Sequence, residues 1–289
     1  MKKVLCGVVI GIFLLCFGPL VYAGILDQIQ KKGEFVVGVR DGAVPFGFFD
    51  KNNERVGFGV DVAKEIGKAL EARFGKPIKL ILKSVNPETR VPLVANHTVD
   101  MVAEATTHTI GREDSVDFSI TYFLSGTQIL AKKSAGFKSY KDLAGKRVGV
   151  SQGSTNERFF RQMNNEGKIK PPVKIVIFQE HPQGLTALQK GIIDAYSTDG
   201  ILLAGLKAKM PEPDKYELVD DLLTFDPYAL VLPHDDSAFR NFVNDQLVKM
   251  IKDGRFNQLY KKWFGPDGVV PFPMSQEFKT LLQLEAWPE

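Results

Sequence analysis

The chain has 289 residues, with 37 lysines and arginines against 34 aspartates and glutamates, a formal charge of +3 and two cysteines. Such a balanced charge, without a basic stripe, argues against a nucleic acid as partner. The chain is long enough for a large core and fits two lobes better than one.

The N-terminus has the pattern of a secretion signal. Met1-Lys2-Lys3 is basic, an apolar run follows to residue 22, and Val21-Tyr22-Ala23 fits the small-residue cleavage rule. We therefore predict that residues 1–23 are a signal peptide and that the mature protein is periplasmic. A membrane anchor is the alternative, but Gly18-Pro19 interrupts the run near its end. Both cysteines, Cys6 and Cys16, lie in this segment, so no disulfide, cysteine-based zinc site or cofactor is expected afterwards.

The mature chain begins with an amphipathic helix over residues 25–32, which Gly33 closes, and a buried strand over 35–39. That strand ends on Arg40, and open α/β sheets bind ligands at the carboxyl ends of their strands. An ordinary surface arginine is the alternative. Asp61 is predicted to cap the next helix.

A further helix is predicted to start at Asn86-Pro87-Glu88-Thr89-Arg90. Arg90 then lies in the first helical turn, where a cation is unfavourable against the helix dipole. This placement indicates an anionic partner, either a ligand or a neighbouring acidic side chain.

The segment from 100 to 127 contains the strongest candidate site. A short buried strand ends at Thr106 and Thr107, and Gly111-Arg112-Glu113 reads as a helix start. Hydroxyls, free N–H groups and one arginine together can hold a carboxylate, which the planar guanidinium grips with two parallel hydrogen bonds. The alternative is an ordinary helix cap beside a surface arginine.

The second half of the chain contains a second candidate corner. Gly153-Ser154-Thr155 forms a glycine turn between a strand and a helix, which predicts a second anion-binding corner. It lacks the glycine spacing and the lysine of a nucleotide-binding loop. His181 follows a strand over 173–178, and Asp199 ends a strand over 193–198, where it could pair with a ligand ammonium or cap the next helix. Ser237 is predicted to cap a helix over 239–251, and the tail from residue 265 is expected to pack along the surface.

Taken together, these segments resemble the periplasmic solute-binding proteins (family 3) that serve ABC importers of polar amino acids, and among them the glutamate/aspartate-binding members. The resemblance spans the mature chain. It rests on these motifs: Val39-Arg40 with Pro45-Phe46, Gly57-Phe58 with Asp61-Val62-Ala63, Gly111-Arg112-Glu113, Val116-Asp117-Phe118-Ser119, Leu143-Ala144-Gly145-Lys146-Arg147-Val148-Gly149-Val150 with Gly153-Ser154-Thr155, Ser197-Thr198-Asp199 with Leu202-Leu203, and Lys262-Trp263-Phe264-Gly265.

The resemblance implies an α/β fold of the type II periplasmic binding protein, with two lobes that close on the ligand like a hinged clamp. Each lobe would be a mixed sheet flanked by helices, and two hinge strands would cross near Gly126 and Tyr228. Lobe 1 would hold residues 24–125 and 229–289, and lobe 2 residues 126–228. A monomer that binds an amino acid and delivers it to a membrane permease is expected.

The resemblance also implies roles for particular residues. Arg112 would bind the ligand α-carboxylate with Thr107 and the corner of Ser154 and Thr155. The α-ammonium would contact the carbonyl of Ala105 and the hydroxyl of Thr107, at a strand end that includes Thr106, together with the carboxylate of Asp199. Arg40, Arg90 and His181 would surround the ligand side chain.

Three potential cations around the side chain suit a carboxylate and disfavour lysine or arginine as ligand. Two positions depart from the glutamate/aspartate pattern. Pro87 stands where a serine often assists the side chain, and Glu104 replaces a small residue. Glu104 is expected either to form a salt bridge within its lobe or to add negative charge near the ammonium. The choice between glutamate and aspartate stays open, and glutamine is an alternative ligand.

One alternative comes from another class: an exported enzyme of the cyclohexadienyl dehydratase kind on the same fold, acting on prephenate or arogenate. Such an enzyme needs a general acid, for which Glu104 and His181 are the candidates. The expected ammonium partner Asp199 argues for a binding protein instead.

Overall fold

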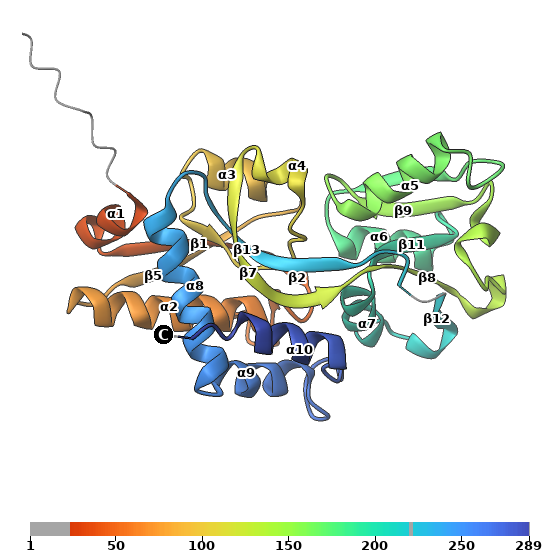
Figure 1. The fold of residues 1–289 in the computed structure, drawn as a ribbon. Coiled ribbons are helices and arrows are strands. Elements are labelled where there is room, and N and C mark those ends of the chain that lie inside the picture. The colour runs from red at the N-terminus through yellow and green to blue at the C-terminus, as the bar shows by residue number, and fades with distance from the viewer. Residues whose placement is uncertain (1–23, 220–221, 289) are drawn as a thin grey trace, which may run out of the picture.

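The computed structural model describes residues 24–219 and 222–288, so the predicted signal peptide lies outside the described residues. Two lobes lie side by side, each built on one five-stranded sheet (Figure 1). The long strands β7 (Val116–Ser125) and β13 (Asp226–Pro233) run together from the first lobe towards the second. This confirms the predicted α/β fold with two sheet-and-helix lobes.

The first lobe has a mixed sheet. Its strands lie in the order β5 (Lys79–Ser84), β1 (Glu34–Val39), β6 (Met101–Val102), β13 and β7. β1 runs parallel to β5 and β6, whereas β13 runs antiparallel to β6 and β7. The helices of this lobe are α1 (Ile25–Lys32), α2 (Phe58–Phe74), α3 (Arg90–Ala95), α4 (Ile110–Glu113), α8 (Ser237–Lys252), α9 (Arg255–Phe264) and α10 (Gln276–Glu285).

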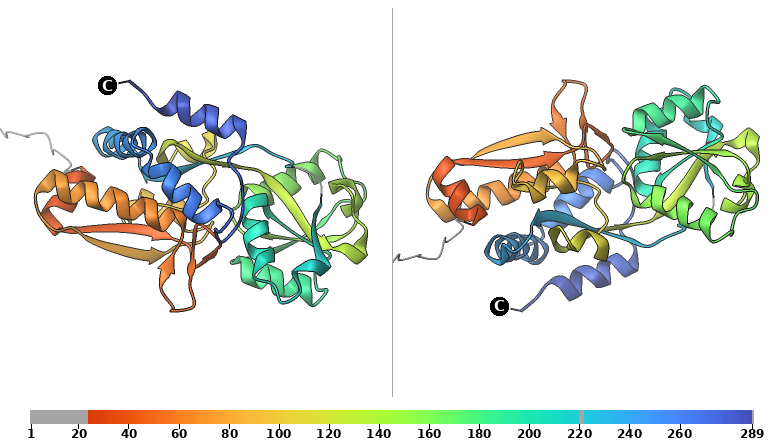
Figure 2. Two further views of the ribbon diagram at one scale, coloured as in Figure 1. Left: turned by 90° about the horizontal axis from the view of Figure 1, so that it is seen from below. Right: turned by 90° about the horizontal axis from the view of Figure 1, so that it is seen from above.

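The second lobe is also built on a mixed sheet. Its strands lie in the order β10 (Lys174–Phe178), β9 (Arg147–Ser151), β11 (Ala195–Asp199), β8 (Thr127–Lys132) and β12 (Tyr216–Val219). Its helices are α5 (Thr155–Asn165), α6 (His181–Gln189) and α7 (Gly200–Ala208), with short 3-10 turns η1 (Lys133–Ala135), η2 (Tyr140–Leu143) and η3 (Pro213–Lys215). Helices cover both faces of this sheet (Figure 2).

The two faces of the second sheet can be followed in one strand. Ile129 and Ala131 of β8 pack in one buried cluster with Phe160 of α5, whereas Leu130 packs in another with Leu185 of α6. Successive side chains of a strand point to opposite faces of the sheet, so a sheet that helices cover on both faces needs apolar residues at every position.

A small three-stranded sheet extends from the first lobe. It consists of β2 (Gly42–Ala43), β3 (Gly47–Phe49) and β4 (Arg55–Val56), and its strand β2 lies against α6 and α7 of the second lobe. β7, which ends at Ser125, belongs to the sheet of the first lobe, and β8, which begins at Thr127, belongs to that of the second. The complete division, with its second crossing near Tyr228, stays a prediction.

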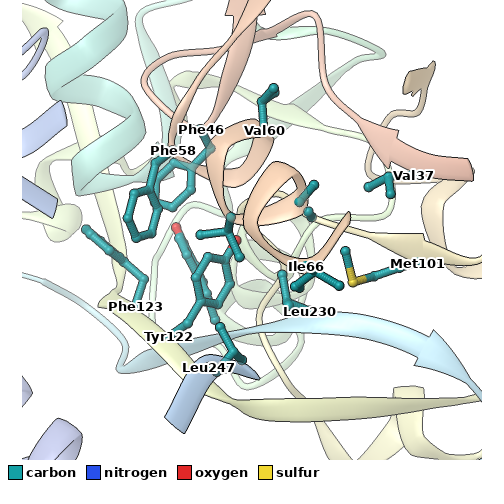
Figure 3. Close-up of a cluster of buried hydrophobic side chains, with 14 of the residues drawn as sticks. Val37, Phe46, Phe58, Val60, Ile66, Met101, Tyr122, Phe123, Leu230 and Leu247 are labelled. Carbon is teal, nitrogen blue, oxygen red and sulfur yellow. The ribbon is translucent and has the colours of Figure 1, made fainter. Parts of the chain in front are cut away.

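An aromatic core holds the first lobe together (Figure 3). Phe58 of α2 stacks on Tyr122 of β7 at 5.7 Å between ring centroids, and Phe46 meets Phe123 edge-on at 5.0 Å. All four side chains are fully buried. Burial of each such ring is worth about 2–3 kcal/mol, so this cluster fixes the second half of β7. From there the hydroxyl of Tyr122 donates to the carbonyl of Glu104 at 2.8 Å, which ties the site segment to the core.

Two predicted helix caps are wrong. Asp61 lies one turn inside α2, which begins at Phe58 because Gly57 takes a φ of 147° that the chain turn needs. Its carboxylate instead accepts a hydrogen bond from Trp263 Nε1 at 2.9 Å. At α8 the cap is Asp236, which accepts from Phe239 N at 2.9 Å, and Ser237 is the first helical residue.

The C-terminal tail contains a helix that the sequence analysis did not predict. In α10, Phe278 and Leu282 are buried against the aromatic core, while Leu284 of the same helix is exposed. No helix within residues 24–219 and 222–288 is long and apolar enough to cross a membrane.

Candidate functional site

Arg40 lies at the carboxyl end of β1, as predicted, and joins the two lobes. Its side chain is buried, with 2% exposed, and Nη1 donates to His181 Nε2 at 2.9 Å. Nη2 donates to the carboxylate of Glu180 at 2.8 Å, which is an ion pair between lobes. The guanidinium Nε is buried without a partner among the described residues, so Arg40 still has a donor to offer.

His181 is a neutral hydrogen-bonding residue and not a third cation. Burial, together with the neighbouring Arg40 and Arg90, lowers the pKa of His181 well below its usual value. Since Arg40 donates to Nε2, the proton lies on Nδ1, which faces the hydroxyl of Tyr196 at 2.8 Å and that of Ser151 at 3.3 Å. The prediction of three potential cations around the ligand side chain therefore has to be corrected to two arginines.

Arg90 and Glu104 form a buried ion pair within the first lobe. Arg90 is the first residue of α3, and its Nη1 donates both to Glu104 Oε1 and to the carbonyl of Ala105, the latter at 2.9 Å. The hydroxyl of Thr106 donates to the same carboxylate oxygen. Burial raises the pKa of Glu104, but Arg90 and Arg40 outweigh it and lower that pKa below its usual value, so Glu104 stays charged. The anionic partner that the position of Arg90 indicated is thus Glu104.

Arg112 lies in the short helix α4, where the motif predicted a helix start, and it reaches main-chain carbonyls of both lobes. Nη1 donates to the carbonyl of Thr107 at 2.5 Å and Nη2 to that of Gly153 at 3.4 Å. Burial and the nearby Arg90 lower the pKa of Arg112 to about 9, so it is still a cation at neutral pH. Only 8% of Arg112 is exposed, yet no carboxylate among the described residues forms an ion pair with its guanidinium.

Asp199 is the buried acid of the second lobe. It accepts hydrogen bonds from Asn156 Nδ2 at 2.8 Å and from the hydroxyl of Tyr228, which belongs to β13. Burial raises the pKa of Asp199 despite these bonds and the nearby Arg90 and Arg112. Although Asp199 occupies the cap position of α7, its side chain makes no capping bond. The carboxylate of Asp199 therefore does not cap α7, which was the alternative role expected for it.

The second predicted corner is used differently by its two residues. The Ser154 hydroxyl caps α5 by accepting from Glu157 N at 3.1 Å, and it donates to the carbonyl of Ser151 at 2.7 Å. Thr155 begins α5 and is partly exposed. The first N–H groups of a helix have no intrahelical acceptor, so at this corner the backbone N–H groups are the donors available to an anion. The Ser154 hydroxyl already has two partners.

Hydrogen bonds join seven of the ten predicted residues into two groups. Arg40 and His181 belong to one group, and Arg90, Ala105, Thr106, Thr107 and Arg112 to the other, which reaches Gly153 beside Ser154 and Thr155. Asp199 is tied to this region through Tyr228, whose β13 position forms a bridge with Thr107.

Four residues at the site were not predicted from the sequence. They are Glu180, Asn156, Tyr196 and Tyr228. Glu180 directly precedes His181 at the start of α6, so the strand end before it could have indicated it. Tyr228 is placed by the register of β13 against β7, in which it faces Phe123, and no local pattern encodes that register.

The lobes also contact one another away from these charges. Gln152 Nε2 of the second lobe donates to Glu88 of the first at 2.7 Å, and a Cβ on Gly153 would lie 3.1 Å from Glu88 Cα. Two α/β lobes that close over buried arginines and acids at strand ends and helix starts define a binding protein of the two-lobed periplasmic type.

Comparison with known proteins specifies the family. The model of "Bacterial extracellular solute-binding proteins, family 3" matches residues 35–266, and the chain belongs to this family. It is 31% identical to the glutamate/aspartate import solute-binding protein of Salmonella typhimurium over 89% of this chain and 87% of the relative. It is 32% identical to the ABC transporter glutamine-binding protein of Bacillus subtilis over 84% of this chain and 85% of the relative.

A solved structure agrees. The ancestral amino acid-binding protein AncCDT-1, described as a precursor of cyclohexadienyl dehydratase, superposes with a TM-score of 0.72 at 31% identity, covering 83% of this chain and 99% of that one. The predicted family and the type II fold are thus confirmed, and the protein is a family 3 solute-binding protein for amino acids. This family implies an amino acid ligand and an ABC permease as partner.

Proposed function

We propose that this protein binds L-glutamate and/or L-aspartate between its lobes, in the periplasm, and delivers the amino acid as a monomer to its permease. The observation that carries the proposal is Arg40. Its one carboxylate partner among the described residues, Glu180, comes from the opposite lobe and has a side chain that is 34% exposed. A ligand carboxylate can take the place of Glu180 while that side chain turns to water.

The ligand's main-chain groups have complementary partners. Arg112 is buried without an acidic partner among the described residues, and Asp199 is a buried acid, so the pair suits an α-carboxylate and an α-ammonium. The carbonyl of Ala105 retains a lone pair beside its bond from Arg90, and Thr107 and Thr155 supply hydroxyls. Thr106 and Ser154 support the site by holding Glu104 and capping α5.

Calorimetric titration of the ligand-stripped protein, residues 24–289, tests the proposal. Glutamate and aspartate should bind, whereas arginine and histidine should not, because Arg40 repels a cationic side chain. Binding of arginine alone, or of no amino acid, would overturn it.

Arg112→Ala should abolish binding of every amino acid, since a buried charge-assisted bidentate contact would be lost. The matched control is Arg147→Ala, which removes an arginine of the second lobe that pairs with Asp194 and is 43% exposed. We expect this control to bind as the parent protein does. If Arg112→Ala kept its affinity, the assignment of the α-carboxylate position would be wrong.

Glutamine is the second candidate ligand. Both arginines of the side-chain region are paired with acids, Arg40 with Glu180 and Arg90 with Glu104, which lowers the preference for an anionic side chain. The glutamine-binding relative of Bacillus subtilis supports this candidate.

The two general acids expected for the dehydratase alternative, Glu104 and His181, do not carry the required proton near neutral pH. Glu104 is held in its charged form by Arg90 and Arg40, and the lowered pKa of His181 keeps that ring neutral. A general acid has to carry its proton near the working pH. Turnover of prephenate would contradict the binding-protein proposal.

A further inference from the structure

The proposed function leaves one charged residue unassigned, and this inference rests on that function. We infer that Glu104 sets the choice between a carboxylate and an amide at the ligand side chain, and that it makes the site accept L-glutamine beside L-glutamate.

Glu104 is completely buried and only half of its carboxylate is used. Oε1 accepts from both Arg90 and Thr106. Oε2 is buried and has no hydrogen-bond partner among the described residues. A buried acceptor without a donor is costly, so this oxygen would gain from a ligand group that donates.

The ion pair with Glu104 also neutralises Arg90, so Arg90 adds no net positive charge next to a ligand side chain. Around the site, the buried cations are Arg40, Arg90 and Arg112, and the buried acids are Glu104, Asp199 and, next to Asp199, Asp226. If Arg112 and Asp199 bind the α-carboxylate and α-ammonium, and Glu104 offsets Arg90, then Arg40 is the one cation left for the side chain. Glu180 from the other lobe already faces it.

A ligand side-chain amide matches two polar atoms that lack a partner among the described residues, the acceptor Glu104 Oε2 and the donor Arg40 Nε. Its NH₂ group can donate to a carboxylate oxygen such as Glu104 Oε2, and its carbonyl can accept from a guanidinium such as that of Arg40, whose Nε is unpartnered. A ligand carboxylate has acceptors alone, so one of its oxygens would meet the negative oxygen of Glu104. The ligand class is therefore an uncharged amide amino acid in addition to the acidic one.

The test compares the dissociation constants of L-glutamate and L-glutamine in the parent protein and in Glu104→Gln. The parent should bind both ligands within about 30-fold of each other, or roughly 2 kcal/mol. Glu104→Gln keeps an acceptor for Arg90 and Thr106 but removes the negative charge and introduces a donor. The preference for glutamate over glutamine should then rise at least tenfold, which a merely structural role of Glu104 would not produce.

Two further variants make the result specific. The double change Arg90→Gln with Glu104→Gln removes both charges, so the preference should return to within threefold of the parent. It also remains informative if the single variant, with its lone buried arginine, fails to fold. Asp100→Asn is the matched control, because Asp100 is another buried acid of the first lobe, but its carboxylate accepts from Val36 N at 2.7 Å on β1.

The outcomes separate the two levels of the proposal. A parent protein that binds neither acidic nor amide amino acids would contradict the proposed function itself. A parent that binds glutamate and rejects glutamine by more than about 30-fold, or roughly 2 kcal/mol, would overturn the role of Glu104, as would a rise of less than tenfold in Glu104→Gln.

Discussion

At the scale of single residues, burial decides which charges the protein tolerates. Asp226, the first residue of β13, is 5% exposed and accepts a hydrogen bond from the Thr224 hydroxyl at 2.6 Å. Burial, followed by repulsion from Asp199, raises the pKa of Asp226 to about 6. Unlike Glu104, Asp226 forms no ion pair with an arginine among the described residues, so hydrogen bonds and the more distant Arg112 compensate its charge only in part.

This leads to a prediction about pH. Because the folded-state pKa of Asp226 is higher than its unfolded value, the folded protein holds the proton more tightly, and the stability that the protonated form provides is lost as pH rises from about 4 through 6. Asp226→Asn should therefore stabilise the protein at pH 7, by up to roughly 3 kcal/mol, and have little effect at pH 4. Thermal unfolding between pH 4 and 8 measures both quantities.

The control for that prediction is Asp245→Asn, the same chemical change at an exposed position of α8. Its free energy of unfolding should follow that of the parent at every pH. A destabilised Asp226→Asn at pH 7 would mean that the ionised carboxylate has a favourable partner in the hinge region.

At the scale of elements, the sequence predicted most helices and strands but not all of their ends. The helix over residues 25–32 was predicted with its bounds, because apolar periodicity and Gly33 in the left-handed conformation are both local signals. Asp61 was misassigned because an aspartate also favours the first turn, and its tertiary partner Trp263 is 202 residues away. Ion pairs between distant segments leave no periodic signal.

The unpredicted helix α10 leads to a prediction about stability. The ring of Phe278 lies 5.7 Å from that of Phe123 and 5.9 Å from that of Tyr260, between centroids. Phe278→Ala should therefore lower the free energy of unfolding of the first lobe by about 3–5 kcal/mol. On the same helix, Leu284 is 73% exposed, and Leu284→Ala should change stability by less than about 0.5 kcal/mol. Denaturant unfolding of both variants measures the difference, and equal effects would show that α10 does not support the core.

At the scale of the whole molecule, the site exists because two lobes meet. The residues that could be predicted stand at strand ends and helix starts, where Arg40, Arg112 and Asp199 have recognisable local surroundings. Their partners could not be predicted, because Glu180 meets Arg40 only across the interface and Tyr228 meets Asp199 only through the crossing strand. Closure of the lobes therefore creates the chemistry that the sequence shows in separate pieces.

Closure depends on a close approach that a single methyl group would disturb. Gly205 of α7, in the second lobe, lies so near the connection after β2 that a Cβ would be 2.4 Å from the carbonyl oxygen of Val44. Neither backbone can give way without moving a lobe. Gly205→Ala should therefore weaken amino acid binding at least tenfold, although alanine favours a helix by about 1 kcal/mol over glycine. Calorimetry gives the affinity, and thermal unfolding should show a stability no lower than that of the parent.

Gly67→Ala separates the two effects, since a Cβ at this position of α2 would meet its nearest atom, Phe35 Cδ1, at an ordinary 3.9 Å. This variant should gain helix stability and bind as the parent does. In small-angle scattering, ligand-saturated Gly205→Ala should have a larger radius of gyration than ligand-saturated Gly67→Ala. If Gly205→Ala bound its ligand with unchanged affinity, the contact between α7 and the small sheet would not be part of the ligand-bound state, and closure would have to depend on Arg40 and its partners alone.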